Sequence, residues 1–116
     1  MAQVVALIDD IFFQAKLLET ARQLGVEVRT CSTAEALDAE IAQAPPRLAV
    51  VDLNARSEPF KALERLSGAA IPSIGFLSHL QTELADRARA AGCNEVMPRS
   101  KFTQNLATIL ARAKSH

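Results

Sequence analysis

Three aspartates directly follow apolar runs of the sequence. Asp9 and Asp10 come after residues 4–8, and Asp52 comes after residues 48–51. Both runs are aliphatic and contain paired valines, which is typical of strands that are buried on both faces. If these strands end at the same edge of a sheet, the three carboxylates lie close together. Like charges at that separation raise one another's pKa and destabilise the fold unless a cation or another partner intervenes.

A hard divalent cation such as Mg²⁺ is the expected partner of this carboxylate cluster. Mg²⁺ binds carboxylates, backbone carbonyl oxygens and water molecules in an octahedron. It also neutralises charge during phosphoryl transfer, where catalysis is mostly positioning and electrostatics. An aspartate carboxylate can itself accept a phosphoryl group. A lone aspartate after a strand is more often a helix cap, but three of them beside one another indicate a magnesium site with phosphoryl-transfer chemistry.

The segments that must position these aspartates alternate between strand and helix patterns. Short apolar runs predict strands at residues 4–8, 26–30, 48–51, 74–77 and 95–97. Apolar residues at helical spacing predict helices at residues 13–24, 32–44, 59–66, 84–91 and 102–113. Gly25 is the expected C-cap of the first helix, and Ser32 with Glu35 is the expected capping box of the second. Pro59 opens the third helix, and Ser100 is the expected cap of the last.

Strict alternation of strands and helices predicts an α/β fold, with a five-stranded parallel sheet and helices on both faces. A chain of this size favours the strand order 2-1-3-4-5, in which the order reverses between the first and third strands. Ligands of open α/β sheets bind at that point, beyond the carboxyl ends of the strands. The first strand ends at Asp9 and Asp10 and the third at Asp52, so the predicted fold places the cluster at the predicted ligand site.

The composition indicates one globular domain that spans residues 1–116, with 49% apolar and 22% charged residues. The 13 basic and 13 acidic side chains cancel, which argues against broad electrostatic binding to nucleic acid or to an acidic membrane. No apolar run approaches the roughly 18 residues of a membrane span, and no signal peptide is visible. Cys31 and Cys93 form no metal-binding pair and are expected to be structural thiols. We therefore expect a cytoplasmic protein without a nucleic-acid or membrane partner.

The residues at the strand ends resemble those of the receiver domain of bacterial two-component response regulators. The resemblance rests on Ile8-Asp9-Asp10, Val50-Val51-Asp52-Leu53-Asn54, Leu77-Ser78 and Arg99, and it covers about residues 4–113. It implies a flavodoxin-like signalling domain that is not an enzyme and that takes a phosphoryl group from a histidine kinase or a phosphotransfer protein. By motif position, Asp52 is the phosphoacceptor, and Mg²⁺ is held by Asp9, Asp10, Asp52 and the backbone carbonyl of Asn54. Ser78 and Arg99 are the implied contacts to the phosphoryl group.

Three positions depart from the pattern of this family. Arg99 stands where the family has a lysine followed by proline, and here Pro98 precedes the basic residue. Arginine keeps the charge, but its guanidinium is bulkier and can pair with two oxygens at once. Ser78 lies one residue beyond the family's Ser/Thr, a shift that normally turns a side chain to the opposite face of a strand. Val96 replaces the aromatic switch residue, so we expect an intact acidic pocket with an altered read-out.

Two functions therefore stay open. One is a phosphoacceptor switch that uses Asp52, and the other is a degenerate receiver that binds proteins independently of phosphorylation. A small Mg²⁺-dependent phosphatase is more remote, because the sequence shows neither a DxD string after the first strand nor a cap domain. In both main alternatives, a downstream protein is expected to bind the face of the fourth helix, fifth strand and fifth helix. Around the pocket, His79 and Arg56 are expected to be solvated, and Phe12 and Phe13 to divide between rim and core.

Overall fold

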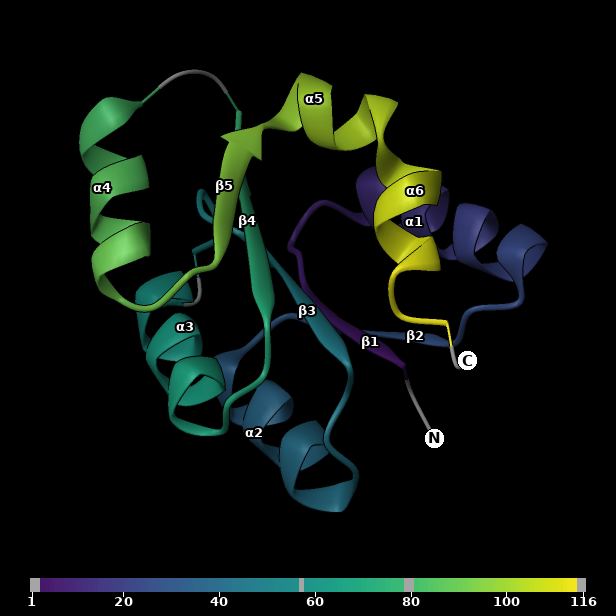
Figure 1. Cartoon of the computed structure of the whole chain (residues 1–116), viewed down its shortest axis with the longest axis horizontal. Helices are drawn as coiled ribbons and strands as arrows, with labels where there is room; N and C mark the ends of the chain where they lie inside the picture. Colours follow the sequence, from purple (N-terminus) through teal and green to yellow (C-terminus); the bar gives the residue numbers. More distant parts are fainter. Residues whose placement is uncertain (1–2, 57, 79–80, 115–116) are drawn as a thin grey trace.

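The computed structural model describes residues 3–56, 58–78 and 81–114, and within them five strands alternate with helices (Figure 1). The strands are β1 (Val4–Leu7), β2 (Val28–Cys31), β3 (Leu48–Asp52), β4 (Ser73–Leu77) and β5 (Glu95–Pro98). The helices are α1 (Ile11–Leu24), α2 (Ala34–Gln43), α3 (Pro59–Gly68), α4 (Thr82–Ala90), α5 (Arg99–Gln104) and α6 (Leu106–Ala111). His79, one of the residues expected near the pocket, lies outside the described residues.

The strands form one parallel sheet in the order β2-β1-β3-β4-β5, which confirms the predicted fold class and strand order. Every residue of β1, β3 and β4 is buried, as continuous apolar runs require in a sheet that helices cover on both faces. The edge strands β2 and β5 are more polar and expose Arg29 and Glu95. Because β1 and β3 are parallel neighbours, their C-terminal ends lie side by side, as the position of the predicted site requires.

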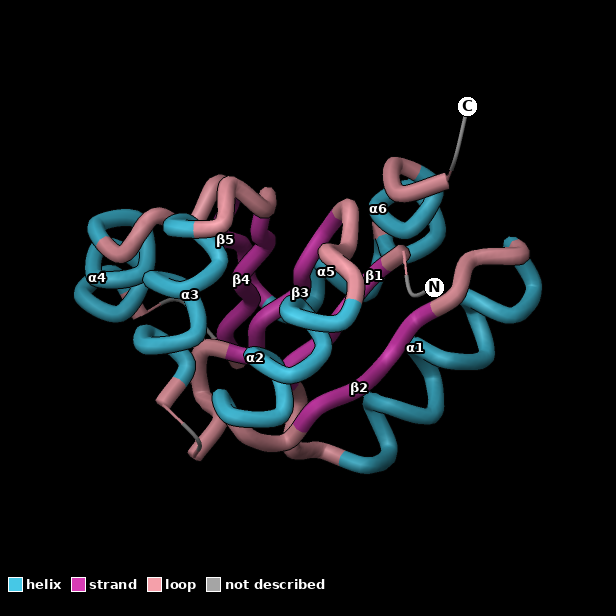
Figure 2. Tube along the Cα trace, turned by 90° about the horizontal axis from the view of Figure 1, so that it is seen from below, coloured by secondary structure: helices cyan, strands magenta, loops and turns pink. Residues whose placement is uncertain are grey.

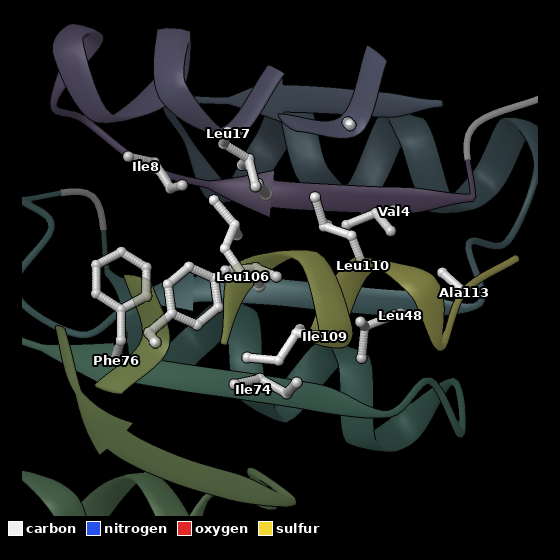
Figure 3. Close-up of a cluster of buried hydrophobic side chains, with 14 of the residues drawn as sticks. Val4, Ile8, Leu17, Leu48, Ile74, Phe76, Leu106, Ile109, Leu110 and Ala113 are labelled. Atoms are coloured by element: carbon white, nitrogen blue, oxygen red, sulfur yellow. The ribbon is translucent and has the colours of Figure 1, made fainter. Parts of the chain in front are cut away.

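The helices form two layers, one on each face of the sheet (Figure 2). Side chains of α1, α5 and α6 pack on one face, and side chains of α2, α3 and α4 pack on the other. Alternate strand residues supply the two cores, so that Val4 and Ala6 belong to the first and Val5 and Leu7 to the second. Figure 3 shows the first core, where side chains of α6 lie against those of β1, β3 and β4.

The last helix is divided, which the apolar periodicity did not predict. α5 ends before Asn105 and α6 begins after it, because Asn105 leaves helical geometry with φ −107° and ψ 14°. The Asn105 side-chain amide donates to the carbonyl of Lys101 over 2.9 Å, the kind of local bond by which asparagine competes with the helix. The expected cap at Ser100 is also wrong. α5 begins at Arg99, with Pro98 in the cap position.

Two other helix caps were predicted from the sequence, one for α1 and one for α2, and the structure confirms the first and displaces the second by one residue. Gly25 ends α1 in the left-handed conformation, with φ 72°, as expected. The N-cap of α2 is Thr33 and not Ser32, because the Thr33 hydroxyl accepts the backbone N–H of Ala36 over 3.0 Å. This shift frees Ser32 to face the C-terminal edge of the sheet.

Two further expectations concern cysteines and membranes. Cys31 on β2 and Cys93 beside β5 are buried free thiols, and their strands form opposite edges of the sheet, as expected. Among the described residues, no helix is both long enough and apolar enough to cross a bilayer.

Candidate functional site

The ends of β1 and β3 open onto a cavity of about 520 Å³ at the C-terminal edge of the sheet. It is lined by Asp9, Asp10, Ser32, Asp52, Asn54 and Arg56. The structure thus brings together the three predicted aspartates and Asn54. Ser32 was not predicted to belong here, although it directly follows β2, the other neighbour of β1. The predicted strand order, combined with the position of Ser32 directly after the second strand, could have indicated that Ser32 lies at this site.

Asp52 is the last residue of β3 and is only 9% exposed. One carboxylate oxygen, Oδ1, accepts the backbone N–H of Asn54 over 2.9 Å. Burial raises the pKa of Asp52 above its ordinary value, the bond from Asn54 and the charge of Arg99 oppose this shift, and Asp9 and Asp10 add to it. Asp52 is therefore a buried acid at the end of a central strand, held by the backbone N–H of Asn54.

Asp10 is the N-cap of α1, and both of its carboxylate oxygens accept hydrogen bonds from other residues. Its Oδ1 accepts the backbone N–H groups of Phe12, at 2.9 Å, and Phe13, at 3.2 Å. Its Oδ2 accepts a bond of 2.9 Å from Nη2 of Arg99. The N–H of Phe13 is the largest cause that lowers the pKa of Asp10, and the bond from Arg99 is the next. Sequence reasoning placed Asp10 in the pocket but did not predict that it caps the following helix.

Asp9 is exposed and connects two loops of the site. Its Oδ2 accepts the backbone N–H of Arg56 over 2.7 Å, so the segment after β1 is tied to the segment after β3. Arg56 therefore contributes its backbone to the site through Asp9, and its position on the cavity wall agrees with the neighbourhood expected from the sequence.

Asn54 connects the loop after β3 to the loop after β4. Its side-chain Oδ1 accepts the backbone N–H of Ser78 over 2.8 Å, and its Nδ2 donates to Oε1 of Gln81 over 3.0 Å. The structure thus brings the backbone of Ser78 to the site. Ser78 is exposed, and it is not one of the residues that line the cavity. Gln81, in the cap position of α4, is a site neighbour that the sequence did not indicate.

Arg99 reaches the acidic cluster from the start of α5. Besides its bond to Asp10, its guanidinium carbon lies 4.4 Å from the centre of the Phe13 ring and 5.8 Å from the centre of the Phe76 ring. Phe12, beside Phe13, is 84% exposed, whereas Phe13 is 8% exposed, so the pair divides between rim and core as predicted. The basic residue after the fifth strand therefore meets the Asp10 carboxylate, which follows the first strand and lies 89 positions away in the sequence.

The donors at this edge have the chemistry that Mg²⁺ requires, since carboxylates and a backbone carbonyl are hard oxygen ligands. Asp9, Asp10, Asp52 and the carbonyl of Asn54 are the groups that would hold the ion. In the part of the chain that the structure describes, no three His, Cys, Asp or Glu side chains converge closely enough to hold a metal. The donor set therefore fits Mg²⁺ in kind, but Asp10 is turned to Arg99 and to its own helix.

Solved receiver domains match this chain over nearly its whole length. The chemotaxis response regulator CheY4 of Vibrio cholerae matches with a TM-score of 0.82 and 19% identity, covering 98% of this chain and 99% of that chain. The receiver domain of NtrX from Brucella abortus matches with a TM-score of 0.80 and 20% identity, covering 95% and 96%. A CheY-like receiver domain protein from Methanospirillum hungatei JF-1 gives 0.79 and 17%, covering 97% and 96%. A longer NtrX chain is matched over 26% of its length.

No protein-family model and no curated protein matches this sequence. The structural similarity is nevertheless continuous along the chain, and the strand order is the one predicted from the alternation of strands and helices. The chain therefore has the receiver-domain fold of response regulators.

Proposed function

We propose that this chain is a receiver in two-component signalling, which accepts a phosphoryl group on Asp52 with Mg²⁺ held by Asp9, Asp10 and the carbonyl of Asn54. The donor is a histidine kinase or a phosphotransfer protein, and the setting is the cytoplasm. The proposal agrees with the signalling role of the solved receiver domains that the chain resembles. It makes Asp52 a phosphoacceptor and not the nucleophile of an enzyme with a separate substrate.

The observation that carries this proposal is the position of Asp52. It ends a central strand at the point where the strand order reverses, and it shares a cavity with Asp9 and Asp10. Burial and the two neighbouring carboxylates disfavour its charge, as the raised pKa records. A purely structural carboxylate gains nothing from such a position, whereas a phosphoacceptor needs a carboxylate that is accessible from one side and poorly solvated.

In the proposed reaction, one carboxylate oxygen of Asp52 attacks the phosphorus of a phosphohistidine. The P–N bond breaks, its electron pair returns to the imidazole nitrogen, and an aspartyl phosphate is formed. The N–H of Asn54 holds the other oxygen of Asp52 and so orients the carboxylate. Mg²⁺, when bound, would neutralise charge on the phosphoryl oxygens, and Arg99 is the positively charged side chain at hand for the same purpose.

Incubation with acetyl phosphate and Mg²⁺, followed by intact mass spectrometry, tests the acceptor. We expect one added phosphoryl group in the parent protein and none in Asp52→Ala. Asp86→Ala removes an exposed aspartate of α4 and is the matched control that keeps the modification. Modification that persists in Asp52→Ala would indicate another acceptor, for which His79→Ala is the next variant. Absence of modification in the parent would favour an interaction module that works without phosphorylation.

The output face is proposed to be formed by α4, β5 and α5, where a downstream protein binds. Val96 of β5 is half-buried and carries no ring that could rotate between two positions, and Ser78 meets the site through its backbone. We therefore expect beryllofluoride with Mg²⁺ to shift backbone amide signals mainly in the loops that carry Asp9, Asp52 and Asn54. Large cooperative shifts throughout α4 and β5 would contradict this weak coupling.

A further inference from the structure

The Arg99 guanidinium lies between the acidic cluster and a set of phenylalanine rings. Its Nη2 donates to Oδ2 of Asp10 over 2.9 Å, and its central carbon lies 4.4 Å from the centre of the Phe13 ring. The two charged side chains are 33% and 40% exposed, so the pair is partly shielded from solvent. One side chain thus makes a charged hydrogen bond and a cation–π contact at the same time.

The rings that support Arg99 are themselves held in place. Phe13 of α1 and Phe76 of β4 have ring centres 5.1 Å apart, and Phe102 of α5 lies 4.8 Å from Phe76 and 5.9 Å from Phe13. Phe76 and Phe102 are almost completely buried. This platform therefore joins α1, β4 and α5 within one of the two cores, and it fixes the guanidinium at Asp10 instead of leaving it mobile in solvent. A planar guanidinium stacks on such a surface more readily than an ammonium group does.

Both carboxylate oxygens of Asp10 already accept hydrogen bonds, and only Oδ2, which is bound by a side chain and not by the backbone of α1, can be exchanged for a cation. Its Oδ1 is used by two N–H bonds from the first turn of α1, and its Oδ2 is used by Arg99. The inference that follows rests on the proposed function. We infer that Arg99, positioned by Phe13, is the resident counter-ion of the acidic site and competes with Mg²⁺ for Asp10. Phe13 acts through Arg99 and is a positioning residue.

This competition links the site to α5. Arg99 is the first residue of that helix, and it directly follows β5. When a divalent ion takes Asp10, the guanidinium must leave it, and the displaced residue lies at the junction of β5 and α5. Exchange at Asp10 thereby changes the contacts of Arg99 at the start of α5. This effect is local, and it needs neither an aromatic residue at Val96 nor the hydroxyl of Ser78.

The metal-free arm of the test uses NMR signals of the Arg99 side chain. Protons above the face of a ring resonate upfield, so the Hδ signals of Arg99 are expected upfield of those of the other arginines. Phe13→Leu should return them to ordinary values. Phe102→Leu is the matched control, since the guanidinium lies over Phe13 and Phe76, and loss of the Phe102 ring should leave the signals upfield. Ordinary shifts in the folded parent protein would overturn the proposal.

The second arm measures Mg²⁺ affinity by calorimetry and by amide shifts, because the chain has no tryptophan or tyrosine for fluorescence. Arg99→Ala should bind Mg²⁺ about fivefold more tightly than the parent, the upper range for a partly exposed ion pair. The Mg²⁺ affinity of Phe13→Leu should be about twofold higher than that of the parent, because Arg99 loses its cation–π contact and is held less firmly at Asp10. The control is Arg112→Ala, which removes the same charge and breaks an ion pair with Glu95 at the other end of β5. In the parent, Mg²⁺ should also return the Arg99 Hδ signals to ordinary values.

Equal gains in Mg²⁺ affinity for Arg99→Ala and Arg112→Ala would show that the gain comes from the change in net charge alone, and this result would overturn the proposal. So would the absence of Mg²⁺ binding in both the parent and Arg99→Ala. These outcomes are separate from those of the phosphorylation test. Exchange of Arg99 for Mg²⁺ without any modification of Asp52 would overturn the proposed function and leave the competition standing.

Discussion

Replacing Asp52 with asparagine should stabilise the folded protein at neutral pH. The folded pKa of Asp52 is raised, chiefly by burial, so the folded state holds this proton more tightly than the unfolded chain does. The stability that this protonated group contributes is complete below the unfolded pKa and is lost as the pH rises through the folded pKa. At neutral pH, the parent protein therefore keeps a disfavoured charge at the end of β3.

The contacts of Asp52 set the direction of this effect. Asp52→Asn keeps an oxygen to accept the N–H of Asn54, and it removes the repulsion from Asp9 and Asp10. It also gives up the attraction to Arg99, which opposes the gain. Removing an unfavourable buried charge at a functional position raises the free energy of unfolding by about 1 kcal/mol. For a chain of this length, that corresponds to a melting temperature about 4 °C higher.

Thermal and urea unfolding, followed by circular dichroism, measure this difference. The gain should be present at pH 7 and should vanish at about pH 3, below the ordinary aspartate pKa of 3.8, where the parent Asp52 is protonated in both states. Asp86→Asn, on the exposed surface of α4, should change stability by less than about 0.5 kcal/mol. Destabilisation by Asp52→Asn at pH 7 would refute the reasoning, because it would show that the carboxylate is favourably paired with Arg99.

Other substitutions test the local geometry. Gly92→Ala should lower the free energy of unfolding by about 2 kcal/mol, because φ is +101° and the new methyl group would lie 2.5 Å from Oγ of Ser67. Gly68→Ala, which meets open space in α3, should instead gain about 0.5 kcal/mol in the same urea titration; equal effects would contradict the geometry. Ala70→Gly should raise stability by roughly 0.5 kcal/mol, since Ala70 has φ 58°, and a loss in urea unfolding would count against strain there. Asp10→Ala should lower the melting temperature more than Asp10→Asn, which keeps the helix cap. The stabilisation from Asp10, whose pKa is lowered, should be lost as the pH falls through that folded pKa, and a pH-independent difference between Asp10→Ala and the parent would contradict this.

Much of the fold follows from short-range patterns. The apolar runs of β1, β3 and β4 predicted buried strands, because a strand covered on both faces buries side chains in both directions. The polar residues of these strands, Asp52 and Ser73, are at strand ends. Strict alternation with helices then left few possible topologies, and the predicted order is the one observed. The same rules placed Asp9, Asp10 and Asp52 at one edge, since a residue at the end of a parallel strand can lie nowhere else.

Local patterns were less reliable where two residues could make the same bond. Ser32 and Thr33 are both good helix caps, and which hydroxyl meets the first turn of α2 depends on where β2 ends. Asn105 interrupts a regular apolar periodicity with a bond to the carbonyl of Lys101. Apolar spacing reports which side chains are buried, and it does not record a break in the backbone between two buried turns.

The sequence by itself determined the sheet, its order and the gathering of three carboxylates at the reversal point, because these follow from the period and the length of each segment. Only the tertiary structure decided which groups these carboxylates bind. The bond between Arg99 and Asp10 joins residues 89 positions apart, and the ring beneath the guanidinium belongs to α1. Likewise, Asn54 meets Ser78 and Gln81 across two loops. Such contacts depend on rotamers and loop paths that close only when the layers pack, so no spacing along the chain encodes them.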